Sequence, residues 1–253
     1  MAIRMIRAIK VTPSLLLKFA RRKEVRVPCI YCPGICITSC PTFLESGNMM
    51  LSPLGYSRYP EIGRRECLKC WRCVSECPLN YELPETFSDG IEVELKLVRE
   101  GAPMLLSVEG LDEGYASRLA EELNAGLFIA TGLLRKYDDG CRIKNLWEIK
   151  RRLKGVKVLS LSPEASHSLK VPFILEAAHE LPLKLEYEGP VHIPCLLLDK
   201  SERILDGLKI IGAKISGVIK DSCLKRSVPD ALILCPRAST GKHLYDLLEV
   251  KTL

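Results

Sequence analysis

The chain has 253 residues, of which 47% are hydrophobic, and a formal net charge of +6. This composition is that of a folded globular protein with room for one large or two ordinary domains, and no uncharged apolar run is long enough to span a membrane. The 12 cysteines occur without a recognisable export signal, so we expect a reducing, cytoplasmic compartment in which thiols bind metal instead of forming disulfides. Glutamine is absent and asparagine occurs four times, a pattern that indicates a thermophilic protein.

Residues 1–27 form a basic segment, in which eight lysines and arginines face the single acidic residue Glu24. Ser14 is a suitable cap for a short helix over residues 15–22. The positive charge predicts docking on an acidic partner subunit or peripheral attachment to an anionic membrane surface. A solvated helix face is the alternative interpretation.

Eight cysteines follow in two runs of related spacing. The first run reads Cys29-x2-Cys32-x3-Cys36-x3-Cys40-Pro41, and the second reads Cys67-x2-Cys70-x2-Cys73-x3-Cys77-Pro78. The second spacing is the one by which bacterial-type ferredoxins hold [4Fe-4S] clusters, and the fourth cysteine of such a run serves the other cluster. If this crossed pattern holds, the first cluster takes Cys29, Cys32, Cys36 and Cys77, and the second takes Cys67, Cys70, Cys73 and Cys40.

Several alternatives to two ordinary clusters stay open. Zinc sites and a disulfide framework fit two four-cysteine runs closed by Cys-Pro less well. The first run has one extra residue, at Pro33-Gly34, so a three-iron or more labile first cluster is an alternative. Lys69 and Arg72 are candidates for raising the potential of the second cluster. Two clusters of about 2− each would lower the net charge to roughly +2, which does not favour a nucleic acid as partner.

Beyond Glu85 the sequence alternates apolar runs with helical periods, which is typical of an α/β domain with a mainly parallel sheet. Residues 157–166 and 230–239 both consist of an apolar strand followed by Ser/Cys-Pro-x-Ala-Ser, which indicates two repeated units. We therefore predict an α+β chain with four parts. They are a basic segment (1–27), a mainly helical two-cluster ferredoxin-like domain (28–100), and two α/β units (101–185 and 186–253).

Three cysteines of the second α/β unit each follow a predicted strand: Cys195, Cys223 and Cys235. Strand ends gather ligand-binding side chains in α/β folds, so a third metal site is one hypothesis, with Asp221, Ser222 or His192 as the fourth ligand. Buried cysteines with no ligand role are the alternative. Cys141 is expected to be structural, and no Gly-rich turn indicates a nucleotide or flavin site.

The stretch Cys36-x3-Cys40-Pro-Thr-Phe, followed by Gly47 and Ser52-Pro-Leu-Gly55, resembles a known family. The family comprises the iron-sulfur subunits of glycolate oxidase, of anaerobic glycerol-3-phosphate dehydrogenase and of heterodisulfide reductase. The resemblance implies a helical domain with two [4Fe-4S] clusters followed by two cysteine-rich CCG domains. The second α/β unit is similar to a degenerate CCG domain at His192-Ile-Pro-Cys195, Ser222-Cys223-Leu224 and Cys235-Pro-Arg-Ala238. In the first unit, Ser162-Pro-Glu-Ala165 has lost both motif cysteines, so we expect no cluster ligand there.

The resemblance implies an iron-sulfur electron-transfer subunit of a multi-subunit redox complex. It would relay single electrons between a flavin- or quinone-linked partner subunit and an acceptor, without catalytic residues of its own. One alternative is a catalytic subunit that reduces a disulfide or quinone at a third cluster on Cys195, Cys223 and Cys235. Another is a scaffold whose clusters only stabilise the fold.

Overall fold

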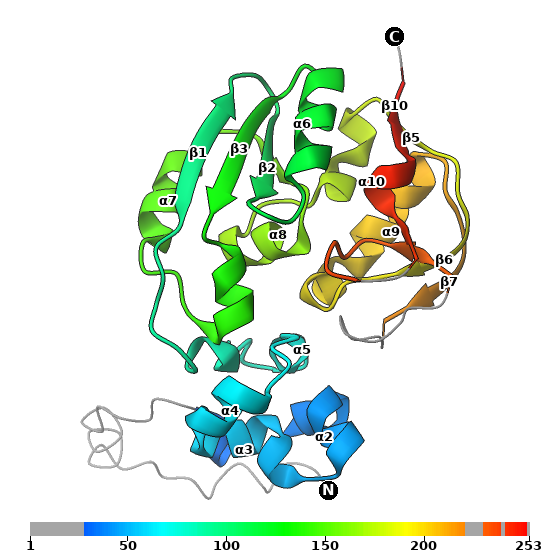
Figure 1. Ribbon diagram of the computed structural model, residues 1–253. Helices are drawn as coiled ribbons and strands as arrows, with labels where there is room; N and C mark the ends of the chain where they lie inside the picture. Colours follow the sequence, from blue (N-terminus) through cyan, green and yellow to red (C-terminus); the bar gives the residue numbers. More distant parts are fainter. Residues whose placement is uncertain (1–27, 221–229, 239–240, 252–253) are drawn as a thin grey trace, which may run out of the picture.

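The computed structural model describes residues 28–220, 230–238 and 241–251. The basic segment 1–27 with its expected helix lies outside the described residues, and so do Asp221, Ser222 and Cys223. Figure 1 shows a small helical unit below two α/β units that stand side by side. The prediction of a mixed α/β chain is confirmed.

Short helices build the helical unit, and no strand lies in residues 28–85. Proline occupies the first position of α2 (Pro41–Ser46), α3 (Pro53–Arg58) and α4 (Pro60–Glu66), where its missing N–H costs no hydrogen bond. Gly47, in the left-handed conformation with φ 65°, ends α2. The unit also contains η1 (Pro28–Tyr31), η2 (Ile35–Ser39), η3 (Met49–Leu51), α5 (Arg72–Ser75) and η4 (Leu83–Glu85). Frequent proline and glycine thus keep each helix to one or two turns.

The first α/β unit contains a four-stranded sheet in the order β1-β3-β2-β4. β2 (Met104–Val108) is buried along its length and runs parallel to β3 (Gly126–Thr131) and β4 (Val158–Ser160). Continuous burial of this kind is usual for a central parallel strand. The connections contain α6 (Glu113–Glu122), η5 (Lys136–Gly140), α7 (Leu146–Leu153) and α8 (Pro163–Leu169).

The boundary of the helical unit differs from the one expected at residue 100. β1 (Glu94–Arg99) pairs antiparallel with β3, and Leu95 is buried against the sheet. β1 therefore belongs to the first α/β unit. The pairing is non-local, so the local sequence pattern does not reveal it.

The second α/β unit repeats the strand order of the first. β6 (Glu188–His192) lies between the parallel strands β7 (Lys214–Ile219) and β8 (Leu232–Ile233), just as β2 lies between β3 and β4. β9 (Lys242–His243) pairs with β8, and β5 (Leu183–Leu185) pairs with β10 (Leu248–Val250). β6 ends at His192, and Cys195 begins η7 (Cys195–Lys200), so Cys195 lies three residues beyond the strand. The unit also contains η6 (Ile174–Glu180), α9 (Ser201–Ile210) and α10 (Leu244–Leu247).

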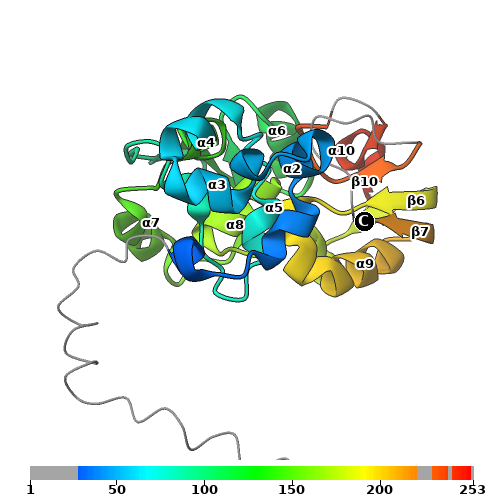
Figure 2. The ribbon, with the colours of Figure 1, turned by 90° about the horizontal axis from the view of Figure 1, so that it is seen from below.

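One apolar core joins the two α/β units, and it includes Leu105 of the first sheet and Val191 of the second. The helical unit has a small core of its own and meets the first α/β unit where Trp71 and Val74 pack on Tyr137. In the view from below, Figure 2 shows α2, α3, α4 and α5 in front of the sheets. The helical unit therefore covers one end of the α/β pair.

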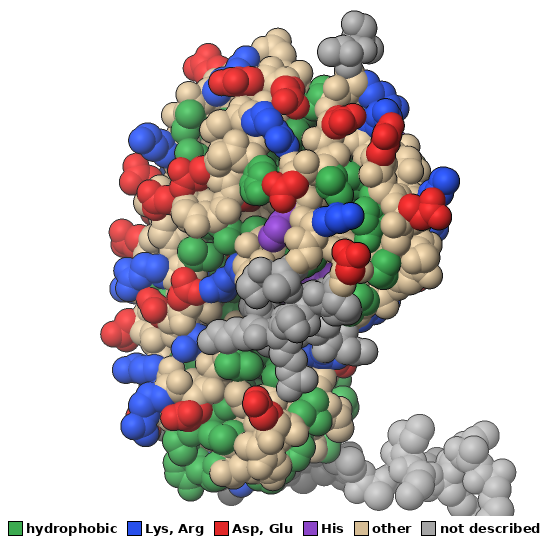
Figure 3. Space-filling view, turned by 45° about the vertical axis from the view of Figure 1, so that its right-hand side comes forward, with side chains coloured by type: hydrophobic (Ala, Val, Ile, Leu, Met, Phe, Trp, Pro, Cys, Tyr) green, Lys and Arg blue, Asp and Glu red, His purple; other side chains and the backbone are tan. Residues whose placement is uncertain are grey.

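Apolar side chains gather at the lower end of the molecule, over the helical unit, as Figure 3 shows. Charged side chains are more frequent over the α/β units in the same view. Within the described residues, no helix has the length and apolar character needed to cross a membrane.

Candidate metal centre

Five cysteines line one cavity of the helical unit. Four of them are Cys29, Cys32, Cys36 and Cys77, and the fifth is Cys73. The first three come from η1, η2 and the loop between them, and the fourth comes from the turn after α5. The structure thus brings together the four residues that the sequence assigned to one cluster. We call this space the first cavity.

A second cavity lies beside the first. The thiols that line it belong to Cys40, Cys67, Cys70 and Cys73, so here too one thiol comes from the other run. Cys73 borders both cavities, as do Pro53 and Leu83. The two four-thiol sets are therefore neighbours.

The loops around these thiols point backbone N–H groups at sulfur. Gly34 N lies 3.4 Å from Cys32 Sγ, and Lys69 N lies 3.3 Å from Cys67 Sγ. Both residues have positive φ, 82° at Gly34 and 51° at Lys69, a conformation that is uncommon outside glycine. Gly34 is also the extra residue of the first run, and the loop that contains it closes around the first cavity. Hydrogen bonds to sulfur are one means by which proteins set cluster potentials.

The thiols are held in surroundings that disfavour a free thiolate. Burial first, and then the charges of neighbouring thiols, raise the pKa of Cys29 and of Cys36 to about 11. The same causes raise the pKa of Cys73 well above its ordinary value. Thiols buried in this way form thiolates more readily where a positively charged group, such as a metal centre, compensates the charge.

The donor set of each cavity fits a [4Fe-4S] cluster in kind, since four cysteine thiolates hold such a cluster and N–H groups aimed at sulfur tune its potential. Within the described residues, no three His, Cys, Asp or Glu side chains converge closely enough to bind one metal ion. A four-iron cluster holds its thiolates farther apart than a single ion does. Cys29, Cys32, Cys36 and Cys77 would hold one cluster, and Cys40, Cys67, Cys70 and Cys73 would hold the other.

All three units meet at a third cavity. Cys70 and Trp71 of the helical unit line it together with Glu164 of the first α/β unit and Cys195 and Cys235 of the second. Cys70 and Trp71 also line the second cavity. The two described cysteines of the predicted third site therefore lie next to the second cavity, and Cys223 lies outside the described residues. His192, one candidate fourth ligand, lines the third cavity as well.

Glu164 is the residue that sequence reasoning missed. It belongs to the motif in which no ligand was expected, yet its side chain lines the third cavity and is only 1% exposed. Its Oε2 has no hydrogen-bond partner in the part of the chain that the structure describes, and burial raises the pKa of this carboxyl to about 7. The sequence did contain a signal. Glu164 directly follows Ser162-Pro163, and in the second repeat Arg237 holds the equivalent position after Cys235-Pro236 and lines the same cavity.

Buried contacts fasten the helical unit to the wall of the third cavity. Lys136, which is 4% exposed, places Nζ 2.7 Å from Glu82 Oε2, 2.6 Å from Glu85 Oε1 and 4.8 Å from the Trp71 ring centroid. Ser75 Oγ donates a hydrogen bond to the carbonyl oxygen of Cys195 at 2.7 Å. These contacts fix α5 and the second cysteine run against both α/β units.

Trp71 lines both the second and the third cavity, and the rings of Tyr137 and His167 pack against it. The rings of Trp71 and Tyr137 lie 5.0 Å apart, and His167 lies 5.8 Å from Trp71. The Tyr137 hydroxyl contacts Ser168 Oγ at 2.6 Å and His167 Nδ1 at 3.1 Å. Burial lowers the pKa of His167 to about 4, so this imidazole is neutral at physiological pH.

Cys141 does not reach these cavities. Its side chain is fully buried among apolar residues of the first sheet, and Sγ contacts the carbonyl oxygen of Arg135 at 3.5 Å. This environment agrees with the structural role expected of it.

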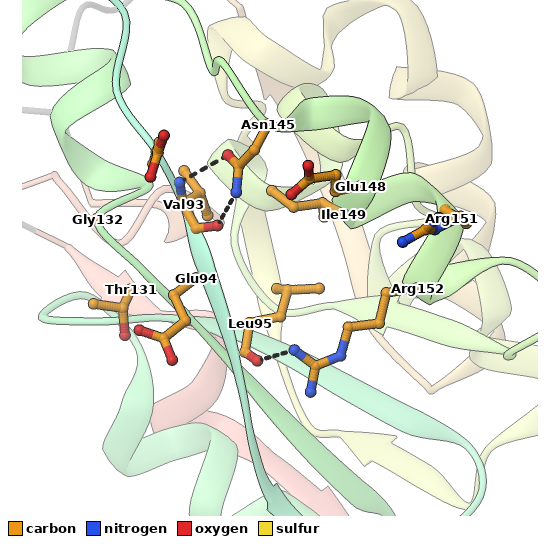
Figure 4. A pocket seen from close by; sticks show the side chains of 11 residues that line it. Val93, Glu94, Leu95, Thr131, Gly132, Asn145, Glu148, Ile149, Arg151 and Arg152 are labelled. Carbon is orange, nitrogen blue, oxygen red and sulfur yellow. Dashed lines mark hydrogen bonds between the residues drawn. The ribbon is translucent and has the colours of Figure 1, made fainter.

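A separate open groove lies between β1 and α7, as Figure 4 shows. Asn145 bonds both the N–H and the carbonyl of Val93, at 3.0 and 2.8 Å, and Arg152 donates to the carbonyl of Leu95. These side chains occupy the free edge of β1, and none of the described residues that line the groove is a cysteine. It therefore contributes nothing to the candidate metal centre.

No family model, curated protein or solved structure matches the chain. The resemblance to iron-sulfur subunits therefore depends on the sequence motifs alone.

Proposed function

We propose that this chain is an iron-sulfur electron-transfer subunit that holds two [4Fe-4S] clusters. The observation that carries the proposal is the crossed arrangement of cysteines around two adjoining cavities. Three cysteines of the second run and Cys40 of the first line the second cavity, and three cysteines of the first run line the first cavity together with Cys77 and Cys73 of the second. A bound [4Fe-4S] cluster supplies one-electron exchange. The protein holds the thiols, covers them and directs N–H groups at sulfur.

The arrangement of cavities supports a relay. Cys73 borders the first and second cavities, and Cys70 borders the second and third. Electrons would pass between a flavin- or quinone-linked partner subunit on one side and an acceptor on the other. A relay of this kind needs no acid or base.

Anaerobic purification followed by iron and sulfide analysis tests the proposal. Two clusters require about eight irons and about eight sulfides per chain. An EPR signal that appears and disappears reversibly during a redox titration is expected for a relay. A protein that binds iron but stays redox-silent would instead be the cluster-stabilised scaffold, and a protein with zinc and no iron would end the proposal.

A second candidate function is reduction of a disulfide or quinone at a third centre. The third cavity favours it, because Cys195, Cys235 and the buried carboxyl of Glu164 share a space that borders the second thiol set. About twelve irons per chain, falling to about eight in Cys223→Ala or Cys235→Ala, would support this candidate. A count near eight that neither substitution changes would favour relay alone.

A further inference from the structure

Two carboxylates share one buried ammonium where the helical unit meets the first α/β unit. Glu82 directly precedes η4 and Glu85 ends it, and both pair with Lys136 of η5, at 2.7 and 2.6 Å. We call these three side chains the charged trio. With all three ionised, the single cation compensates only one of the two negative charges. An uncompensated charge in such buried surroundings is unfavourable, and binding a proton removes it.

The charged trio adjoins the second cavity from two directions. On one side, Lys136 Nζ lies 4.8 Å from the ring centroid of Trp71, which lines that cavity. On the other side, Pro84, the residue before Glu85, lines it as well. Neither Trp71 nor Pro84 is among the described residues that line the first cavity. A change of charge on the trio therefore acts on the second thiol set more directly than on the first.

The two carboxyls of the trio differ in proton affinity. Burial, and next hydrogen bonding to Glu82, raise the pKa of Glu85 to about 7, although Lys136 opposes this. Burial alone would raise the pKa of Glu82 as well, but hydrogen bonding to Glu85 and the charge of Lys136 outweigh it, so that this pKa is lowered. Paired carboxyls that separate in this way hold one proton between them. That proton is exchanged near neutral pH and makes the trio neutral.

The other titratable groups around the trio are uncharged at neutral pH. In the described part of the chain, those that face the two glutamates are Tyr81, Tyr137, Cys141 and His167. The pKa of each tyrosine and of the thiol is raised, chiefly by burial, and burial lowers that of the imidazole to about 4. The two aspartates of η5 are paired with arginines. Proton exchange in this region therefore falls to Glu85.

Electron uptake at the second thiol set would strengthen proton binding by the trio. Each electron adds one negative charge beside it, and a nearby negative charge favours the protonated form of a carboxyl. The effect is reciprocal, so a proton on Glu85 favours the reduced state by the same free energy. The proton comes from solvent, to which the Glu85 side chain is 27% exposed. It forms an O–H bond on the carboxyl, and no other bond changes.

We propose that the charged trio is a proton-binding site coupled to electron uptake at the second thiol set. Glu85 binds up to one proton as an electron arrives there and releases the proton when the electron leaves. The first thiol set exchanges electrons without this proton. The inference rests on the proposed function for the electron, but proton binding by the trio is measurable without it.

A redox titration of the full-length protein, followed by EPR between about pH 6 and 9, tests the coupling. The signal of the second thiol set is the one that Cys70→Ala abolishes. We expect its midpoint potential to fall as the pH rises above about 7, because protons then become scarce. The fall should reach up to about 59 mV for each tenfold decrease in proton concentration, the value for a one-electron couple. The potential of the first set should stay constant.

Two isosteric substitutions separate the roles of the carboxyls. Glu85→Gln removes the titrating proton, so the second potential should become independent of pH and stay near the low-pH value of the wild type. Glu82→Gln removes a hydrogen bond and a charge that raise the pKa of Glu85, so the pH-dependent range should move to lower pH. Glu61→Gln is the matched control, because Glu61 is exposed on α4 and its loss should leave the slope unchanged. Equal iron content and circular dichroism establish that the variants are folded.

Carbon-13 NMR of protein labelled at the glutamate carboxyls measures the proton directly. One resonance should titrate near pH 7 or above, and it should be missing in Glu85→Gln. A second potential that ignores pH in the wild type, or a slope that survives Glu85→Gln, would overturn the coupling and leave the proposed function in place. A protein without reversible EPR signals would overturn both, and the NMR titration would then report on proton binding alone.

Discussion

The two four-thiol sets adjoin each other, yet their surroundings differ. Cys29, Cys32, Cys36 and Cys77 of the first set are all partly exposed. In the second, Cys40 and Cys70 are buried, and Trp71 separates the cavity from the third one. The same arrangement of ligands therefore occurs once near solvent and once between three units. Since burial and local charge set cluster potentials, the two centres are expected to have different potentials and different partners.

The largest expected effect comes from removing the fourth cysteine of a run, because this tests which cavity it serves. Cys77→Ala should abolish the same EPR signal as Cys32→Ala, although Cys77 belongs to the second run. Cys40→Ala should abolish the same signal as Cys70→Ala. Each substitution is expected to remove about four irons per chain. Loss of one signal by both Cys77→Ala and Cys70→Ala would contradict the crossed assignment.

The next largest effect is expected from Lys136→Met, which should affect the second cavity but not the first. It leaves Glu82 and Glu85 without their buried cation, at an expected cost of about 3–5 kcal/mol in the free energy of unfolding. Urea denaturation measures this cost, and EPR should show a change at the second cluster but none at the first. Arg135→Met is the matched control, because Arg135 pairs with Asp139 at an exposed site and should lose less than about 1 kcal/mol. Equal losses in the two variants would contradict the bracing role of Lys136.

Acid is expected to destabilise the packing of His167 against Trp71, which lines the second cavity. The folded state lowers the pKa of His167 from 6.5 to about 4 by burial, so the unfolded chain binds the extra proton first as the pH falls. The stability contributed by neutral His167 is therefore complete above about pH 6.5 and decreases between about pH 6.5 and 4, by up to about 3 kcal/mol. Urea denaturation across this range measures it, and His167→Gln should flatten the dependence. An unchanged slope in that variant would sink the idea.

The smallest predicted effect concerns the first cavity. Gly34 has φ 82°, and a Cβ there would lie 2.6 Å from Ile37 Cδ1. Gly34→Ala should therefore destabilise the protein by about 1–2 kcal/mol and make iron loss from the first cluster faster. Gly47→Ala is the control, because Gly47 has φ 65° but no atom of the described residues near its would-be Cβ. A faster loss of iron in both variants would show that backbone strain alone accounts for the effect.

The two proposed thiol sets could be predicted from the sequence because most of the cysteines of each set are close together in the chain. Cys67, Cys70 and Cys73 lie within seven residues of one another, and the ferredoxin spacing predicts the fourth ligand. Strands such as β2 and β3 were predicted because continuous apolar runs bounded by turn residues are local signals. By contrast, the expected boundary at residue 100 placed residues 94–99 in the helical unit. They form β1 and pair with β3, about 30 residues later in the chain, and no local pattern indicates this pairing.

The third cavity could be predicted only in part. Cys195 and Cys235 were recognised from their positions after apolar runs, but the contribution of Glu164 was not. Its environment is made by Pro163 beside it, Tyr137 from η5 and Trp71 from the helical unit. Burial of a carboxyl is a property of this assembly, and no local pattern records it.

The sequence by itself determined the two cysteine runs, the prolines that keep the helices short, and the strand repeat of the α/β units, because each depends on residues close in the chain. Only the tertiary structure decided that one thiol set is partly exposed and that the other lies against Trp71, which Lys136 contacts and which also lines the third cavity with Glu164. Those surroundings come from three units that meet through buried contacts. The difference between the two cavities, and the third cavity next to one of them, therefore arises from packing between units.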